Sequence, residues 1–367
     1  MIISAEQVKA LARECGFELT GITSALPSED FALYQQWREA GIAGEMGYLT
    51  DYRGDLRSDP RNLLPEAQSI ICVGKLYNTP RPDSIEKGAA SISQYAWGAD
   101  YHQVMRCGLE LLVAKMAQLH PEPFQSKICV DTAPLLERSY AKAAGLGWIG
   151  KNTCLINQEK GSWFFLGEVL VSLSIAPDTP VPNRCGTCTR CIDACPTEAI
   201  VPEGDGWQLD ARLCISYLTI EKRGEIPGDL QPKMANHIFG CDICQDVCPW
   251  NRRAAVTTDL RFGRREMPEL LGDLAQFTAE DFRRVFRQSP VWRAKYSGFL
   301  RNVAVALGNT ADASGCEPLK HLILHSDALV ATAARQSLRR LQETLGQEGS
   351  CQTAITCHPA DRLQDTS

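Results

Sequence analysis

Half of the cysteines in this chain are concentrated in one short segment. Eight of the sixteen lie between Cys185 and Cys248. The first run reads C-x2-C-x2-C-x3-C-P and ends at Cys195, which is the bacterial spacing for 4Fe–4S clusters. A second run, C-x2-C-x3-C-P, ends at Cys248, and Cys214 lies between the two runs. Because each 4Fe–4S cluster is held by four thiolates, the segment predicts two clusters and a role in electron transfer.

The order of the ligands along the chain predicts how they are shared. In two-cluster ferredoxins the cysteine that precedes the proline binds the other cluster. The last cysteine of each run is therefore expected to bind the cluster that is held mainly by the other run. One predicted set is Cys185, Cys188, Cys191 and Cys248. The other predicted set is Cys195, Cys214, Cys241 and Cys244.

Two other uses of cysteine fit this segment less well. Structural zinc is bound by C-x2-C pairs, but C-x2-C-x2-C-x3-C-P is not the spacing of a zinc ribbon. Disulfides would need an oxidising compartment. The N-terminal residues MIISAEQVKALARECG lack the basic and apolar regions of a signal peptide. We therefore expect a cytoplasmic protein with reduced cysteines.

Charge is distributed unevenly along the chain. At 367 residues it is long enough for two or three domains, and no apolar run approaches the length of a membrane span. The net charge is −6, yet residues 251–345 contain fifteen Lys and Arg against ten Asp and Glu. This basic end predicts either a surface that binds a polyanion or an ordinary solvated helical surface.

Residues 1–178 are predicted to form an α/β domain, because helical and strand-like patterns alternate there. The helical patterns cover residues 5–16 and 101–119, and the strand-like runs cover residues 18–24, 69–77, 127–130 and 163–175.

Three further segments follow this domain. Residues 179–252 form the predicted ferredoxin-like segment with two clusters. Residues 253–345 show short helical patterns similar to HEAT-type repeats, and so few repeats are expected to pack on the cluster segment rather than stand alone. Residues 346–367 have no periodicity and are expected to be a disordered tail.

Asp131 is the candidate catalytic acid. It follows the apolar run ICV and precedes a helix that is predicted to open near Pro134, a place where α/β proteins position reacting groups. The alternative is that Asp131 caps this helix. As a proton donor it would need apolar surroundings that raise its pKa. A lone histidine such as His102 is more often structural than catalytic. Arg57 lies in a loop-like stretch and could bind an anionic group or face water.

A glycine pattern further along resembles a dinucleotide fingerprint. Gly145, Gly147 and Gly150 match G-x-G-x-x-G, but that fingerprint must follow a strand and open a helix. Here it follows a predicted helix. We interpret the glycines as a helix cap, or as positions where the backbone closely approaches a flat ligand.

Several segments together resemble the epoxyqueuosine reductase family, over nearly the whole chain up to about residue 342. They are YAWGADYH (95–102), VDTAPLLERSYAKAAGLGWIGKN (130–152), CGTCTRCIDACPTEAI (185–200), CISYLTIEKRG (214–224), FGCDICQDVCPWN (239–251) and RNVAVALGN (301–309).

The resemblance implies an oxidoreductase that reduces epoxyqueuosine to queuosine at the wobble position of tRNAs with GUN anticodons, those for Asp, Asn, His and Tyr. It implies a nitroreductase-like N-terminal domain that binds cobalamin, two clusters that pass electrons to cobalt, and a basic end that holds the anticodon arm. Asp131 matches the proton donor of the family. Contacts to the corrinoid are implied at Arg57, Ser93, Asp131, Lys151, Asn152 and Ser216. Since the motif D-x-H-x-x-G is absent, we expect base-off cobalamin.

Other functions are possible for a chain with these motifs. A corrinoid reductive dehalogenase would usually carry a twin-arginine export signal and would not need a basic helical end. A ferredoxin-type electron carrier would leave residues 1–178 without a role. A zinc-containing nucleic-acid-binding protein is a third alternative. The sequence does not identify the low-potential electron donor, and a monomer is the simplest expectation.

Overall fold

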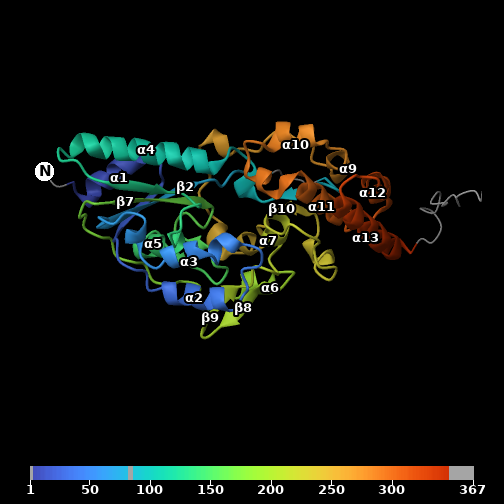
Figure 1. Cartoon of the computed structure of the whole chain (residues 1–367), viewed down its shortest axis with the longest axis horizontal. Helices are drawn as coiled ribbons and strands as arrows, with labels where there is room; N and C mark the ends of the chain where they lie inside the picture. The colour runs from blue at the N-terminus through green and yellow to red at the C-terminus, as the bar shows by residue number, and fades with distance from the viewer. Residues whose placement is uncertain (1–2, 82–85, 347–367) are drawn as a thin grey trace, which may run out of the picture.

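A four-stranded antiparallel sheet forms the centre of the N-terminal part of the molecule (Figure 1). The structure is a computed structural model and describes residues 3–81 and 86–346. In spatial order the strands are β1 (Leu19–Ser24), β2 (Ser69–Leu76), β7 (Phe164–Val171) and β4 (Ser126–Cys129). Every neighbouring pair is antiparallel. The predicted mixture of helices and strands is therefore confirmed, but the sheet is not parallel.

Helices cover both faces of this sheet, which explains why β2 and β7 are almost continuously apolar. α1 (Ala5–Glu14) and α4 (Tyr101–Leu119) pack on one face, and α5 (Glu137–Ala143) packs on the other. Successive side chains of β2 alternate between these layers. Ile71 contacts the side of α1 and α4, whereas Ile70 contacts the side of α5.

The helix that was predicted to open near Pro134 begins later, at Glu137. Asp131 has a left-handed backbone with a φ of 54°, and the Thr132 N–H donates back to the Val130 carbonyl. The chain therefore turns sharply here, and Pro134 disfavours a helical conformation at the residue before it. Asp131 lies too far from α5 to cap it, so the capping interpretation is wrong.

Short elements connect the parts of this N-terminal unit. They are α2 (Phe31–Glu39), η1 (Gly47–Leu49), α3 (Tyr52–Leu56), η2 (Pro60–Asn62), β3 (Ser91–Ile92), η3 (Gln94–Ala96), β5 (Trp148–Ile149) and β6 (Leu155–Ile156).

The cysteine-rich segment is built from short elements joined to the N-terminal unit by backbone pairing. These elements are α6 (Arg190–Asp193), β8 (Ile200–Glu203), β9 (Gly206–Leu209), α7 (Ile215–Ile220), η4 (Pro232–Met234), β10 (His237–Phe239), α8 (Ile243–Asp246) and η5 (Pro249–Asn251). β10 pairs in parallel with β3. This pairing positions the second cysteine run directly beside the N-terminal unit.

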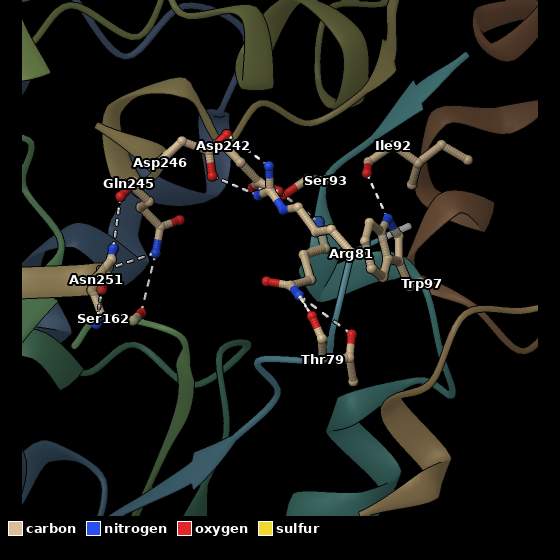
Figure 2. A network of polar contacts seen from close by, with 11 residues as sticks. Thr79, Arg81, Ile92, Ser93, Trp97, Ser162, Asp242, Gln245, Asp246 and Asn251 are labelled. Atoms are coloured by element: carbon tan, nitrogen blue, oxygen red, sulfur yellow. Dashed lines mark hydrogen bonds and ion pairs between the residues drawn. The ribbon is translucent and has the colours of Figure 1, made fainter. Parts of the chain in front are cut away.

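A polar network makes the same junction rigid (Figure 2). Arg81 pairs with Asp246 at 2.5 Å and faces Asp242 at 3.6 Å. Asn251 accepts the Ser162 N–H at 2.7 Å and donates to the Ser162 hydroxyl at 2.8 Å. Side chains on both sides of Cys244 and Cys248 are thus anchored to the N-terminal unit.

The C-terminal helices pack on the cysteine-rich segment, as their small number predicted. They comprise η6 (Leu260–Phe262), α9 (Leu271–Leu274), α10 (Ala279–Phe286), η7 (Pro290–Ala294), α11 (Lys295–Leu307), η8 (Ala313–Gly315), α12 (Cys316–Ile323) and α13 (Ala328–Leu345). α11 is the central helix of this unit and contacts α12, α13 and β10. The predicted tail lies, apart from Gly346, outside the described residues.

Two buried polar residues of α11 fix this packing. Arg301 is 1% exposed, and its guanidinium donates to the carbonyls of Leu218, Lys222 and Gly224 at 2.7–2.8 Å. Asn302 donates to two further carbonyls, of Thr219 and Ile238. The motif RNVAVALGN therefore holds the end of α7, the helix that follows Cys214. Across the described part of the chain, no helix is long and apolar enough to cross a membrane.

Candidate functional site

The seven cysteines of the two runs and Cys214 lie in two groups. Cys191 interacts electrostatically with Cys185, Cys188 and Cys248. In the other group, Cys241 interacts with Cys195 and Cys214, and Cys244 interacts with Cys214 and Cys241. These proximities favour the predicted sets, in which Cys195 and Cys248 are exchanged.

The environment of these thiols suits metal ligands better than free cysteines. Burial raises the pKa of Cys191 to about 11 and that of Cys241 to about 12. Neither would be a thiolate at neutral pH without a nearby positive charge, and bound metal ions supply that charge. The donor set of eight soft sulfur ligands fits two iron–sulfur clusters.

The loop that follows the glycine pattern touches both groups of cysteines. The Lys151 ammonium donates to the carbonyls of Gly186 and Cys188, both at 2.9 Å. Asn152 donates to the Cys244 carbonyl at 3.3 Å. A ligand that contacts Lys151 and Asn152 would therefore lie close to both predicted clusters.

Two further residues that are predicted to contact the corrinoid also lie near the cysteine loops. The Ser93 hydroxyl donates to Asp242, two residues before Cys244 (Figure 2). Ser216 is half-buried in the first turn of α7, next to Cys214. The structure thus gathers Ser93, Lys151, Asn152 and Ser216 around the cysteine loops, and their contacts to a corrinoid stay predictions.

Asp131 and Arg57 form the other part of the site, on either side of Tyr48. Arg57 is 6% exposed and donates to the Tyr48 carbonyl at 3.3 Å. Burial, with the charges of Glu221 and Asp131, raises the pKa of Tyr48 to about 12. The Arg293 guanidinium lies 5.2 Å from the centre of the Tyr48 ring.

Asp131 itself does not have the environment that the sequence led us to expect. Burial raises its pKa, but the hydrogen bond and charge of His102 outweigh burial, and the positive charge of Arg293 acts in the same direction. The net pKa of Asp131 is lowered. The expectation of apolar surroundings that raise this pKa is therefore wrong, because His102 lies 3.1 Å from the carboxylate.

A half-buried carboxyl, Glu137, and a buried carboxyl, Glu168, adjoin the turn at Asp131. Glu137 accepts the Asp131 N–H at 2.5 Å. Burial, followed by the charge of Asp131, raises the pKa of Glu137 to about 8. Glu168, on β7, is 0% exposed and interacts with Glu137, and burial raises its pKa well above the ordinary value. Since two carboxylates in such contact cannot both stay charged, the pair holds at least one proton and supports the turn at Asp131.

The glycine pattern has a structural role. Gly145 has a φ of 77° and ends α5. A Cβ atom on Gly147 would lie 2.2 Å from the Ile156 carbonyl oxygen, and one on Gly150 would lie 2.5 Å from the Ile156 side chain. The glycines therefore cap a helix and allow β5 to approach β6, and the pattern does not open a helix as a dinucleotide site would.

The basic C-terminal part forms a groove beside α10. A cavity of about 800 Å³ is lined by Arg265, Thr278, Glu280, Asp281, Arg283, Arg284, Arg287 and Gln288. A second cavity of about 440 Å³ shares Arg265 and Gln288 with the first and extends to Asp100. The "basic groove", defined by these two cavities, thus runs from α10 to the residues beside His102.

The sequence did not single out several residues around Asp131. Tyr48 and Arg293 come from short 3-10 turns far apart in the chain, and no periodicity or motif marks them. Glu168 did have a signal, because a lone carboxylate in the apolar run WFFLGEVLVSLSI is unusual for a buried strand. His102 was quoted in the motif YAWGADYH but was weighed mainly as a structural residue.

Comparison with known proteins identifies the family of this chain. A family model described as "Epoxyqueuosine reductase QueG, DUF1730" matches residues 57–132, and one described as a 4Fe-4S double cluster binding domain matches residues 184–251. An epoxyqueuosine reductase of Xanthomonas campestris is 44% identical over 313 residues, which are 83% of this chain and 87% of that protein. That of Escherichia coli is 41% identical over 312 residues, 83% of this chain and 81% of that protein.

Solved structures agree. An epoxyqueuosine reductase bound to an epoxyqueuosine-modified tRNA-Tyr stem loop matches with a TM-score of 0.82 and 29% identity, covering 94% of each chain. The Bacillus subtilis enzyme, with its catalytic loop swung out of the active site, matches with a TM-score of 0.81 and 29% identity, covering 92% of this chain and 90% of that one. The chain therefore belongs to the epoxyqueuosine reductase family, and it contains a 4Fe–4S double cluster domain.

Proposed function

We propose that this protein reduces epoxyqueuosine to queuosine in tRNA. The observation that carries the proposal is identity of 41–44% to epoxyqueuosine reductases over about four-fifths of the chain. The site is consistent with it, because an acidic group, two groups of cluster-binding thiols and a basic groove adjoin one another. The direct test is conversion of epoxyqueuosine in tRNA to queuosine by the purified protein with a reductant.

Cobalamin is the cofactor that the proposal requires between Asp131 and the clusters. The residues around the cysteine loops suit it, since Ser93, Lys151, Asn152 and Ser216 offer hydroxyl, ammonium and amide groups to a molecule fringed with amides and phosphate. The buried Gln94 side-chain oxygen has no hydrogen-bond partner among the described residues, so an amide acceptor beside Ser93 is available. When bound, cobalamin supplies low-valent cobalt as the reductant, and base-off binding stays a prediction.

The protein groups would bind the substrate and manage protons. Conversion of an epoxide to an alkene consumes two electrons and two protons and releases the oxygen as water. The departing oxygen must be protonated, and a positioned acid contributes about 10²–10⁴-fold to such a step. We assign this role to Asp131, with Arg57, Tyr48 and Arg293 fixing its surroundings.

The proposed organisation keeps the predicted boundaries. Residues 1–178 would form a nitroreductase-like cobalamin domain, residues 179–252 the ferredoxin-like domain, and residues 253–345 a HEAT-like region that binds tRNA. We propose a cytoplasmic monomer that receives electrons from a low-potential donor and acts on tRNAs with GUN anticodons.

Binding of tRNA is expected to depend on the basic groove. Arg283 and Arg287 are exposed on this groove, whereas Arg340 donates to Gln231 and Val305 within the fold. Replacing both Arg283 and Arg287 with alanine should lower the slope of log affinity against log salt by about two, because each phosphate contact releases about one counterion. Filter binding of an anticodon stem loop at several salt concentrations measures this slope.

The matched control for this experiment removes two exposed cations elsewhere. Arg13 and Lys127 are exposed on α1 and β4, and their double alanine variant should bind tRNA with the wild-type slope. Equal slopes for the groove variant and this control would contradict the proposed tRNA surface.

The predicted exchange of Cys195 and Cys248 between the two ligand sets can be tested by iron content. Wild-type protein should hold about eight iron atoms, and loss of one ligand set should leave about four. Cys191→Ala combined with Cys248→Ala should therefore still leave about four, because both belong to one set. Cys244→Ala combined with Cys248→Ala should leave close to none. The reverse result would show that the ligands are not exchanged.

A further inference from the structure

We infer that Asp100 and His102 form a proton relay that supplies Asp131, so that His102 is a positioning and proton-supplying residue for the reduction. This inference rests on the proposed function. It concerns two residues of the motif YAWGADYH that have no role in the proposed function.

The three side chains are connected in a row. Asp100 Oδ1 lies 2.7 Å from His102 Nδ1, and Asp131 Oδ2 lies 3.1 Å from His102 Nε2. Asp100 is the N-cap residue of α4 and also accepts the His102 N–H. A carboxylate at Nδ1 fixes which way the imidazole ring points, and here it directs Nε2 to Asp131.

The ring of His102 is held on its faces as well as at its edges. It stacks on Tyr101 with ring centres 4.1 Å apart, and Tyr101 stacks on Phe165 of β7 at 4.3 Å. The sheet therefore sets the position of the imidazole. Asp131 is fixed from the other side by its left-handed backbone and by Glu137.

Solvent can reach the outer end of the row. The His102 side chain is 33% exposed and that of Asp100 is 42% exposed, and Asp100 lines the 440 Å³ cavity of the basic groove. A proton lost from His102 can therefore be replaced from solvent, while the Asp131 side chain, itself 44% exposed, would be covered by the substrate.

The charges of Asp100 and Asp131 keep His102 protonated at neutral pH. Burial lowers the pKa of His102, but its hydrogen bonds to Asp100 and Asp131 raise it to about 9. The other titratable and charged groups that face Asp131 come from separate elements: Tyr48, Tyr95, Tyr101, Glu137 and Arg293. Arg293 favours the carboxylate form of Asp131, while Tyr48, Tyr95 and Tyr101 stay neutral because burial raises each pKa.

The relay accounts for one of the two protons of the reduction. As the C–O bond breaks, the proton on His102 Nε2 passes to Asp131 Oδ2, and Asp131 delivers a proton to the departing oxygen. His102 becomes neutral and takes a replacement proton from solvent, while the electrons come from the proposed cofactors. No atom of the protein is consumed.

The first test measures His102 without any turnover. An NMR titration of ¹⁵N-labelled histidine, with the His102 signal identified by its loss in His102→Gln, should show a midpoint near 9. Asp100→Asn keeps the helix cap, since asparagine caps as well as aspartate, and should lower the midpoint by at least about one pH unit. A wild-type midpoint near the ordinary value of about 6.5, or no shift in Asp100→Asn, would overturn the relay.

The second test measures turnover against pH. Wild-type turnover should fall only above about pH 9, as His102 loses its proton. In His102→Gln the decline should begin at least about two pH units lower, and turnover should recover as the pH is reduced. A loss of equal size at every pH would show that His102 is merely structural. His321→Gln, an exposed position on α12, is the matched control and should retain the wild-type profile.

The two tests separate this inference from the proposed function. If wild-type protein does not reduce epoxyqueuosine, the proposed function fails, while the NMR titration still decides whether two carboxylates hold the proton on His102.

Discussion

Replacing Asp131 with asparagine is expected to lower the turnover of epoxyqueuosine by about 10²–10⁴-fold, which is the usual contribution of a positioned general acid. Asparagine has nearly the same shape and tolerates the left-handed backbone at this position. It cannot pass a proton from His102 to the substrate. Single-turnover conversion of epoxyqueuosine-containing tRNA measures the loss.

The controls for this variant isolate the chemical step. Iron content and tRNA binding should match the wild type, because Asp131 is not a predicted cluster ligand and lines neither cavity of the basic groove. Cobalamin binding should persist, because asparagine keeps a polar side chain of the same size at this implied corrinoid contact. Asp205→Asn, at an exposed turn between β8 and β9, should retain full activity. Equal turnover in Asp131→Asn and Asp205→Asn would exclude Asp131 as the proton donor.

Replacing Arg301 with methionine should destabilise the protein by about 3–5 kcal/mol. Methionine is unbranched and fills much of the same space, but the carbonyls of Leu218, Lys222 and Gly224 lose their donor. Each buried carbonyl left without a partner costs about 1–3 kcal/mol. Anaerobic urea unfolding of cluster-loaded protein measures the change.

The same substitution should loosen the second predicted cluster, because Arg301 holds the end of the helix that follows Cys214. Arg339→Met is the matched control, since Arg339 is exposed on α13, and it should change stability by no more than about 0.5 kcal/mol. Arg301→Lys should be intermediate, because an ammonium cannot reach all three carbonyls in the geometry of the guanidinium fork. An unfolding midpoint unchanged in Arg301→Met would contradict this role.

Local patterns were sufficient to predict the four strands of the main sheet and the two helices on one of its faces. The apolar runs around Ile71 and Val169 became the two inner strands, and the helical period of residues 101–119 gave α4 with the same bounds. These patterns succeed because burial on a sheet face or a helix face repeats at a fixed interval along the chain. The start of α5 could not be predicted, because the turn at Asp131 depends on a left-handed residue and on the hydrogen bond that Glu137 accepts from the Asp131 N–H.

The electrostatics of the site could not be predicted from local patterns. Asp131 was predicted to be the acid, but its pKa depends on His102 and Arg293, which reach it from α4 and η7. The sequence separates these residues by long intervals, and only the packing of the C-terminal helices on the cysteine-rich segment brings Arg293 to Tyr48 and Asp131. The sheet is antiparallel, so the rule for reacting groups in α/β proteins, from which Asp131 was predicted to be the acid, does not apply to this sheet.

The cysteine sets stay a prediction, but a local pattern was sufficient to make it. Ligand spacing in a metal site is constrained by the metal, so C-x2-C-x2-C-x3-C-P carries its geometry within a few residues. Cys214 stands alone in the sequence and was assigned to the second set because eight thiolates are needed. The structure places it with Cys241 and Cys244 through α7, which Arg301 and Asn302 hold in position.

Conversion of epoxyqueuosine is the measurement that tests the central proposal most directly. Cluster-loaded protein, cobalamin and a low-potential reductant would be incubated with tRNA-Tyr that contains epoxyqueuosine, and the nucleosides of the digested tRNA would then be separated. We expect queuosine to accumulate as epoxyqueuosine disappears, with no conversion when cobalamin is omitted and little in Asp131→Asn. Epoxyqueuosine that persists unchanged with fully loaded wild-type protein would contradict the proposed function.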